Sequence, residues 1–262
     1  GGTSGGGSQG QARKVVIRPA PEWRLPGVFA HRCGGALAPE NTLAGLCMDA
    51  TMGIRAVEFD VMLSVDGSPW LIHDETLERT TNGYGRVCDT PDRVLHSLDA
   101  GGYLHRAFFG ERLPTLEAAA ACCRELGLMA NIEIKPAGGF EALTGEVVTR
   151  RILELWQGAP LPLVSSFSEL ALEMARRLAP RLPIGYLCER VPADWQRRLD
   201  SLAAFSLHCA ASELDASVLA AANADGIPVL CYTVNDKQLA ASLFERGVTS
   251  VFSDRIDLLS RM

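Results

Sequence analysis

The chain has 262 residues, of which 47% are hydrophobic and 21% charged, and its formal net charge is −6. This length allows a substantial core, and the negative charge argues against nucleic acid as the main partner, because a phosphate backbone is bound by a basic surface. No apolar run approaches the roughly 20 residues that cross a bilayer, so we expect no membrane span. A local basic pocket for one phosphate remains compatible with this composition.

The chain begins with a Gly/Ser-rich stretch, GGTSGGGSQG, which lacks the apolar centre of a signal peptide. We expect residues 1–11 to be a flexible tag or linker, and residues 25–262 to form a single domain. The eight cysteines include no CxxC pair, and several lie inside apolar runs. This pattern favours buried free thiols in a reducing compartment over a disulfide framework, so we expect a cytoplasmic location.

From Val28 onward, short β-rich runs alternate with helical segments. The predicted strands cover residues 28–31, 56–63, 69–73, 129–135, 163–167, 184–187, 205–208, 229–234 and 250–253. The predicted helices cover residues 40–52, 115–126, 141–156, 169–178, 194–202, 214–224 and 236–245. Thr115 and Gly127 are typical of the beginning and the end of the second of these helices.

Eight βα units of roughly 25 to 35 residues, without a break in composition, predict a closed TIM (β/α)8 barrel. A doubly wound open sheet is the alternative, but no GxGxxG motif follows the first strand to support it. Residues 75–113 are irregular and glycine-rich, and they exceed the usual length of a βα loop. We therefore predict an insertion there, after the second strand.

Alternation within the strands predicts a cluster of carboxylates. Glu58 and Asp60 share one face of their strand, while the apolar residues between them share the other. The apolar face must pack on helices, so both carboxylates should point into the barrel, and the same holds for Glu133 and Lys135. Three converging acids repel one another unless a cation lies between them, and an all-oxygen set suits Mg²⁺ or Ca²⁺. The alternative is that Glu133 forms a buried ion pair with an arginine or lysine.

Two histidines lie where strands end. His31 closes the first strand and His73 follows the second, and barrel enzymes place catalytic groups at such positions. A pair beside a cation can act as general base and general acid, although a lone histidine at a strand end is more often structural. Arg32 and Lys135 could hold a phosphate, or each could be a plain ion-pair partner.

A series of motifs resembles the glycerophosphodiester phosphodiesterase family. In chain order they are HR (31–32), PENT (39–42), ExD (58–60), DG (66–67), HD (73–74), RTTNG (79–83), PTLE (114–117), EIK (133–135), TVN (233–235) and SD (253–254). The resemblance covers about residues 28–258. It departs from the family at Cys33, where a glycine is usual, and at Tyr232, where a tryptophan is common.

The resemblance implies a TIM barrel that hydrolyses glycerophosphodiesters to an alcohol and sn-glycerol 3-phosphate. It implies that Glu58, Asp60 and Glu133 hold Mg²⁺ or Ca²⁺ and that His31 and His73 are the acid/base pair. Arg32 and Lys135 would lie near the phosphate, Tyr232 would face the glycerol, and residues 75–113 would lie over the barrel mouth.

Two other functions stay open. A lysophospholipase D could share the same catalytic residues, and a non-catalytic barrel could bind phosphorylated ligands. Residues 75–113 are rich in charge, and their one apolar cluster, at 107–109, is too short for an interfacial helix. We expect that cluster to plug onto the barrel. We expect the substrates to be small, water-soluble glycerophosphodiesters, selected with little regard to head group.

Overall fold

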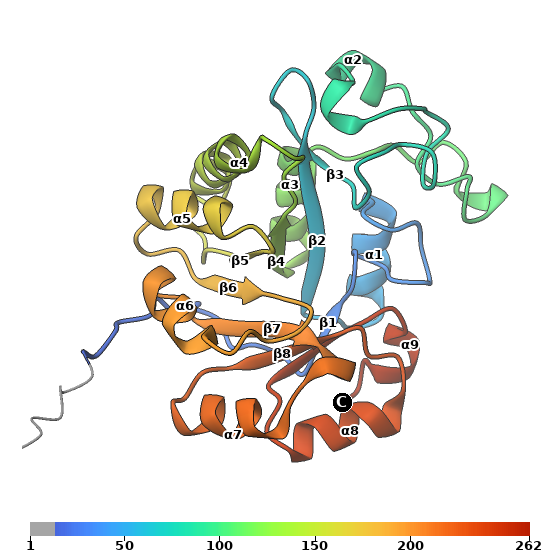
Figure 1. Ribbon diagram of the computed structural model, residues 1–262. Helices are drawn as coiled ribbons and strands as arrows, with labels where there is room; N and C mark the ends of the chain where they lie inside the picture. Colours follow the sequence, from blue (N-terminus) through green and yellow to red (C-terminus); the bar gives the residue numbers. More distant parts are fainter. Residues whose placement is uncertain (1–13) are drawn as a thin grey trace, which may run out of the picture.

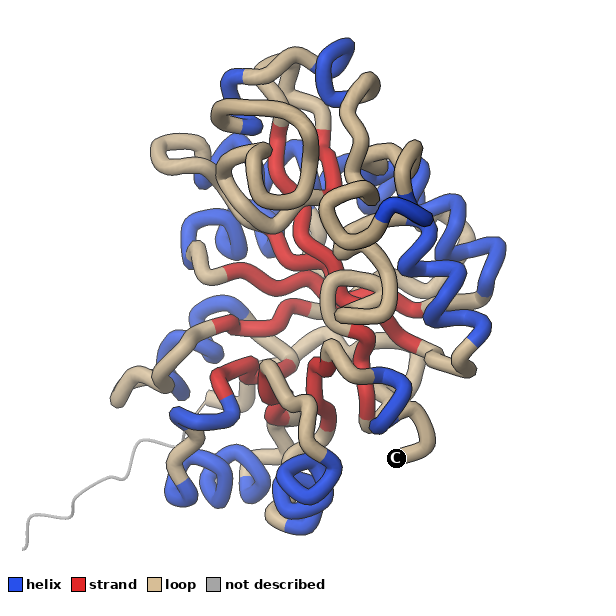
Figure 2. Tube along the Cα trace, turned by 90° about the vertical axis from the view of Figure 1, so that its right-hand side faces the viewer, coloured by secondary structure: helices blue, strands red, loops and turns tan. Residues whose placement is uncertain are grey.

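Eight parallel strands form a closed barrel in the computed structural model, which describes residues 14–262 (Figures 1 and 2). The predicted linker at residues 1–11 lies outside the described residues. The barrel strands are β1 (Val28–Ala30), β2 (Ala56–Leu63), β4 (Met129–Ile134), β5 (Leu163–Ser166), β6 (Ile184–Leu187), β7 (Ser206–Ala210), β8 (Val229–Tyr232) and β9 (Ser250–Ser253). Pairing of β1 with both β2 and β9 closes the barrel, so the prediction of a TIM barrel is confirmed.

One further strand lies outside the barrel. β3 (Pro69–Leu71) pairs antiparallel with the end of β2. The predicted extended run at residues 69–73 therefore forms a hairpin with β2, and it ends two residues before His73.

Helices separate the barrel strands and surround them (Figures 1 and 2). They are α1 (Leu43–Thr51), α3 (Leu116–Leu126), α4 (Glu141–Leu155), α5 (Glu169–Leu178), α6 (Trp195–Leu202), α7 (Ala216–Ala224), α8 (Lys237–Glu245) and α9 (Ile256–Leu259). Helix α1 begins at Leu43 and not at Glu40 as predicted. Asn41 has a φ of 54°, outside the right-handed helical range, and the Thr42 side chain caps the helix by accepting from the Gly45 amide.

The core follows the alternation along the strands. Val57, Phe59 and Val61 of β2 pack in one cluster with Ile132 and Ile134 of β4 and with the helices. A separate apolar cluster lies inside the barrel. Its buried members are Phe29, Ala56, Leu163, Leu230 and Phe252. The apolar strand faces thus pack outward, and the polar residues between them are directed to the barrel interior.

Residues 75–113 lie beside β3 and contain η1 (Val87–Asp89), α2 (Asp92–Leu95) and η2 (Arg106–Phe108) (upper right of Figure 1). They share a small core with β3, in which Trp70, Leu77 and Leu95 are buried. Phe109 is 78% exposed. The prediction that residues 107–109 plug onto the barrel is therefore wrong for Ala107 and Phe109, which are both exposed, and the small core is built from other side chains. None of the helices within residues 14–262 is long and apolar enough to cross a membrane.

Candidate active site

The structure brings the three predicted carboxylates together on the neighbouring strands β2 and β4. Glu58 and Asp60 come from β2, and Glu133 lies opposite Asp60 in the parallel register of β4. One oxygen from each carboxylate lies within 4.8 Å of the others. Among residues 14–262, Glu133 Oε1 is buried without a hydrogen-bond partner. The cluster has the donor set and the spacing of a site for a hard cation.

Burial of like charges perturbs the acidities of this cluster. Burial raises the pKa of Glu58 well above its ordinary value, and the charges of Asp60 and Glu133 raise it further. Burial and the charge of Asp60 likewise raise the pKa of Glu133. Burial also opposes ionisation of Asp60, but His73 and Lys135 outweigh it and lower the pKa of that carboxyl. A bound cation would remove the repulsion that holds the first two pKa values up.

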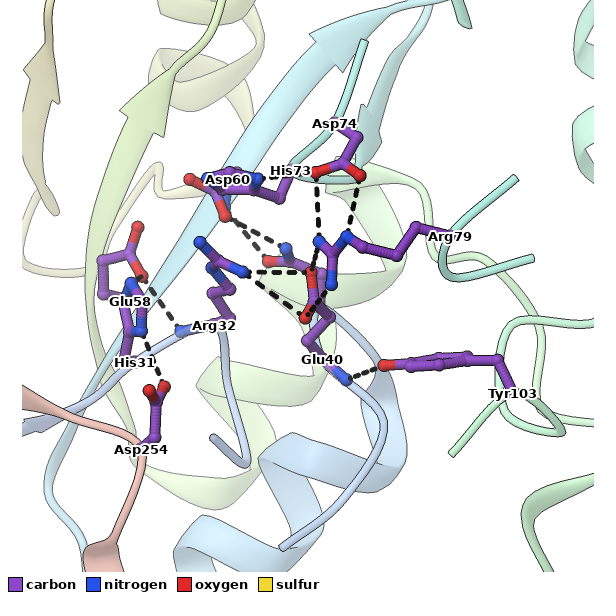
Figure 3. Close-up of polar contacts among 11 residues, drawn as sticks. His31, Arg32, Glu40, Glu58, Asp60, His73, Asp74, Arg79, Tyr103 and Asp254 are labelled. Atoms are coloured by element: carbon purple, nitrogen blue, oxygen red, sulfur yellow. Dashed lines mark hydrogen bonds and ion pairs between the residues drawn. The ribbon is translucent and has the colours of Figure 1, made fainter. Parts of the chain in front are cut away.

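The loop after β1 is shaped to hold Glu58. Arg32 and Cys33 have φ angles of 52° and 66°, a backbone conformation that residues other than glycine rarely adopt. This bend directs two backbone amides at Glu58: the Arg32 amide donates to its Oε2 at 3.0 Å, and the Cys33 amide donates to its carbonyl at 2.8 Å. The Arg32 guanidinium reaches toward Glu40 at 3.5 Å (Figure 3). Cys33, where the family usually has glycine, is fully buried in this bend.

Asn41 holds the second carboxylate from the same loop. Its Nδ2 donates to Asp60 Oδ2 at 3.0 Å, and its Oδ1 accepts from the Asp60 amide at 3.1 Å. This two-point contact fixes the side chain of Asp60 relative to its own backbone. The asparagine of the PENT motif therefore supports the acidic cluster directly.

Each predicted histidine is held at Nδ1 by an aspartate. His31 Nδ1 lies 2.7 Å from Asp254 Oδ1, and its Nε2 lies 3.9 Å from Glu58 Oε2. His73 Nδ1 lies 2.8 Å from Asp74 Oδ1. Burial lowers the pKa of His73, although Asp60 and Asp74 act in the opposite direction. A hydrogen bond at Nδ1 fixes the ring and leaves Nε2 for proton transfer.

An arginine connects the second histidine to the loop after β1. Arg79 donates to both oxygens of Asp74 and to both oxygens of Glu40, at distances from 2.6 to 3.0 Å (Figure 3). These hydrogen bonds hold the pKa of Asp74 well below its ordinary value. The Glu40 amide also donates to the Tyr103 hydroxyl at 2.9 Å. Residues 75–113 are thus tied to the site at two points.

Two openings meet at this cluster. The inner cavity, of about 270 Å³, lies within the barrel and is lined by His31, Arg32, Glu58, His73, Asn131, Glu133, Ser165, Phe167, Leu187, His208, Tyr232, Thr233 and Phe252. The outer groove, of about 590 Å³, is lined by Met62, residues 73–76, residues 133–136, Glu141 and residues 166–168. His73, Glu133 and Phe167 border both. Lys135 borders the outer groove, and Tyr232 borders the inner cavity.

A family model described as the glycerophosphoryl diester phosphodiesterase family matches residues 31–258. The chain belongs to this family. A glycerophosphodiester phosphodiesterase of Caldanaerobacter subterraneus subsp. tengcongensis is 32% identical over 229 residues, which cover 87% of this chain and 93% of that protein. The protein is therefore a phosphodiester hydrolase.

Solved structures of the family agree with the fold. A phosphodiesterase of Oleispira antarctica, solved in complex with the product sn-glycerol-3-phosphate, has a TM-score of 0.87 and 39% identity, covering 90% of this chain and 96% of that chain. A glycerophosphodiester phosphodiesterase of Agrobacterium tumefaciens has a TM-score of 0.74 and 26% identity, covering 91% and 100%. The family's barrel thus accounts for nearly the whole chain.

Several residues at the site had no role in the interpretation of the sequence. The family motifs already contained Glu40, Asn41, Asp74, Arg79 and Asp254, and their place in motifs beside His31, His73 and Asp60 was the available signal. The polar residues lining the inner cavity at Asn131, Ser165 and His208 gave a weaker signal. Their strand positions were visible in the sequence, but the small cavity they share was not.

Proposed function

We propose that this member of the family hydrolyses small glycerophosphodiesters to an alcohol and sn-glycerol 3-phosphate with the help of one divalent cation, Mg²⁺ or Ca²⁺. The observation that carries the proposal is the acidic cluster at the point where the inner cavity meets the outer groove. A phosphodiester has two arms joined at phosphorus. With its phosphate at the shared residues His73 and Glu133, one arm extends into each opening.

Glu58, Asp60 and Glu133 would hold the cation. The orphaned oxygen of Glu133 and the mutual repulsion within the cluster support this assignment. A bound divalent cation supplies Lewis-acid stabilisation of the negative charge that develops on the phosphate oxygens. Arg32 and Lys135 approach from the inner and the outer side and would share that charge.

His31 and His73 would transfer the protons. The Nε2 atom of one imidazole accepts a proton from the attacking O–H group, and the other imidazole donates a proton to the departing alkoxide. Their Nδ1 hydrogen bonds to Asp254 and Asp74 support this role, because each bond orients a ring toward the cluster. Either water or a hydroxyl of the substrate could be the nucleophile in this scheme.

The size of the inner cavity favours a substrate without an acyl chain. Its volume of about 270 Å³ lies below the roughly 300–1,000 Å³ of pockets that hold drug-sized ligands. A glycerol arm is small enough for this space, whereas a glycerol arm esterified with a fatty acid is not. We therefore favour deacylated phospholipids over the lysophospholipids that a lysophospholipase D would use.

The test is release of sn-glycerol 3-phosphate from glycerophosphocholine, measured with the protein as purified, after exhaustive chelation, and after addition of Mg²⁺ or Ca²⁺. We expect chelation to abolish turnover and the cation to restore it. Glu58→Gln should lower activity by about 10²-fold or more, because it removes one carboxylate of the cation site. The circular dichroism spectrum of this variant should be unchanged. Glu173→Gln, at an exposed position on α5, is the matched control. Full turnover by metal-free protein would refute the role of the cation.

The proposal includes two further predictions, on the domain organisation and on the cellular location. Residues 25–262 act as a single catalytic domain that carries residues 75–113 as an insertion, and the family match over residues 31–258 supports the first part. The cytoplasmic location rests on the spacing of the cysteines. Fractionation of the cells that produce the protein would test it.

A further inference from the structure

Glu40 lies between two arginines that hold it unequally (Figure 3). Arg79, from residues 75–113, donates to both carboxylate oxygens, from Nη2 to Oε1 at 2.6 Å and from Nη1 to Oε2 at 3.0 Å. Arg32, from the loop after β1, approaches the same two oxygens only to 3.5 Å, beyond the usual range of a hydrogen bond. Arg79 therefore pairs closely with Glu40, whereas Arg32 pairs with it weakly.

Arg32 keeps donors that the protein does not use. Its Nε is buried and has no hydrogen-bond partner among residues 14–262. The guanidinium lines the inner cavity together with Glu58 and His73. An arginine binds a phosphate through several N–H groups in one plane. Because its contacts with Glu40 are long, Arg32 can turn these groups to a phosphate without breaking a close ion pair.

This weak hold on Arg32 depends on Arg79. The ion pairs of Glu40 within residues 14–262 are those with Arg32 and Arg79, and the Glu40 side chain is only 13% exposed. If Arg79 were removed, Arg32 would be the remaining partner for a largely buried carboxylate. An unpaired charge in such a place is costly, so Arg32 and Glu40 should close to a direct ion pair. Arg32 would then be withdrawn from the phosphate.

Arg79 itself lies outside the space that a substrate would occupy. The described residues that line the inner cavity and the outer groove include Arg32 but neither Glu40 nor Arg79. The backbone of Glu40 is fixed from the same side as Arg79, because its amide donates to the Tyr103 hydroxyl at 2.9 Å. A change in the pairing of Glu40 should therefore be met by movement of the flexible Arg32 side chain.

We propose that Arg79 is a positioning residue, which occupies Glu40 so that Arg32 stays available to the phosphate of the substrate. The inference rests on the proposed function, in which Arg32 shares the charge of that phosphate. It gives the ion pair between residues 75–113 and the loop after β1 a role in phosphate affinity. The other contacts of Arg79, with Asp74, support His73, so their loss should affect turnover separately.

A double-mutant cycle separates this role from a merely structural one. The dissociation constant of inorganic phosphate is measured by calorimetry on the protein with Mg²⁺, together with KM and kcat for glycerophosphocholine. We expect Arg79→Gln to weaken phosphate binding about 10-fold, the size of one lost contact with a charged group. Glu40→Gln removes the competing charge and should bind phosphate at least as tightly as the unmodified protein.

The double variant Arg79→Gln/Glu40→Gln gives the decisive comparison. Its phosphate affinity should return to within about 3-fold of that of the unmodified protein, because no carboxylate at position 40 competes for Arg32. Its kcat should stay about 3- to 10-fold low, since Asp74 is still released from Arg79. A residue that only stabilised the fold would show no such recovery when a second contact is removed.

Two further variants complete the test. Arg79→Lys keeps a positive charge beside Glu40 and should weaken phosphate binding by about 3-fold or less. Arg86→Gln, at an exposed arginine of the same segment, is the control. If Arg79→Gln binds phosphate as tightly as the unmodified protein, or if the double variant stays as weak as Arg79→Gln, the inference is refuted even though glycerophosphocholine is turned over. If the unmodified protein neither binds phosphate nor releases sn-glycerol 3-phosphate, the proposed function fails, and the inference fails with it.

Discussion

The inner cavity and the outer groove differ in size and in the residues that line them. The inner cavity, of about 270 Å³, lies within the barrel, and beyond the acidic cluster and Arg32 it is lined by buried neutral polar groups beside Tyr232 and Phe252. The outer groove, of about 590 Å³, is bordered by charged side chains at Asp74, Glu75 and Lys135. Fixed donors and acceptors in a small cavity discriminate shape and hydrogen bonding, whereas exposed charges in a wide groove discriminate weakly. The contrast suggests strict selection of one arm of the diester and tolerance of the other.

A single strand carries the change from one region to the other. Along β4 and just beyond it, the inward positions are Asn131, Glu133 and Lys135. They supply in turn a neutral amide in the lining of the inner cavity, a carboxylate at the acidic cluster and an ammonium at the outer groove. The same alternation that buries Ile132 and Ile134 against helices therefore sets out three parts of the site.

The largest expected effect comes from the two histidines beside the acidic cluster. His31→Ala and His73→Ala should each lower kcat by about 10²-fold or more, because each removes a positioned proton-transfer group. The loss should be similar for substrates with different head groups, since the histidines transfer protons at the attacking and departing oxygens and not at the rest of the head group. His105→Ala, in the exposed part of residues 75–113, serves as control. Near-normal kcat with reduced thermal stability in both variants would show that the two histidines are structural and do not transfer the protons.

Changes in the substrate should have unequal effects on the two arms. Acylation of the glycerol should lower kcat/KM by about 10-fold or more, because the inner cavity excludes the chain. Replacing choline by ethanolamine or glycerol on the other arm should change kcat/KM by less than about 10-fold. The two series are compared at one cation concentration and below the micelle threshold of the lysolipid. Faster cleavage of lysophosphatidylcholine than of glycerophosphocholine would reverse the assignment of the two regions.

The barrel and the acidic cluster could be predicted from the sequence because both depend on strand periodicity. Alternation placed Glu58, Asp60 and Glu133 inside without any knowledge of the contacts, and the family motifs fixed their order along the chain. The aspartate partners of the histidines required the fold. Asp254 reaches His31 from a position 223 residues away, at the other end of the chain, and only closure of β9 on β1 brings them together.

Local backbone conformation limited the prediction elsewhere. The beginning of α1 was misplaced because Asn41 takes a positive φ, which a propensity argument does not detect. Phe109 was expected to be buried because it is apolar. Its exposure shows that the small core of residues 75–113 was already filled, and a sequence does not show how much space a core leaves.

A smaller effect should appear in the pH dependence of Asp74→Asn. Asp74 raises the pKa of His73 through their hydrogen bond, against the lowering by burial. Removing the carboxylate charge should therefore lower that pKa further and shift the limb of the pH–rate profile that belongs to His73 toward acid. The limb shifts toward acid whether His73 works as base or as acid, because the pKa of His73 falls in either case.

Asp254→Asn provides the matched comparison for this shift. It removes a carboxylate that orients the ring of His31, so it should lower kcat/KM and leave the limb that belongs to His73 where it is. The measurement is kcat/KM for glycerophosphocholine against pH at saturating cation. An unchanged profile in Asp74→Asn would mean that His73 does not set either limb.

The smallest expected effect concerns Tyr232, and it distinguishes packing from hydrogen bonding in the inner cavity. The Tyr232 hydroxyl donates to the Cys188 carbonyl at 2.8 Å, so this donor is used within the protein and not for the ligand. Its ring lies edge-on to Phe167, with 6.4 Å between the ring centroids. We therefore expect Tyr232→Phe to raise KM for glycerophosphocholine less than about 3-fold, because the ring that faces the cavity remains. Tyr232→Ala should raise KM about 10-fold with a smaller fall in kcat, since it removes a wall that contacts substrate and transition state alike. If Tyr232→Phe and Tyr232→Ala have equal effects, the hydroxyl and not the ring shapes the cavity, and the carbonyl of Cys188 becomes its essential partner.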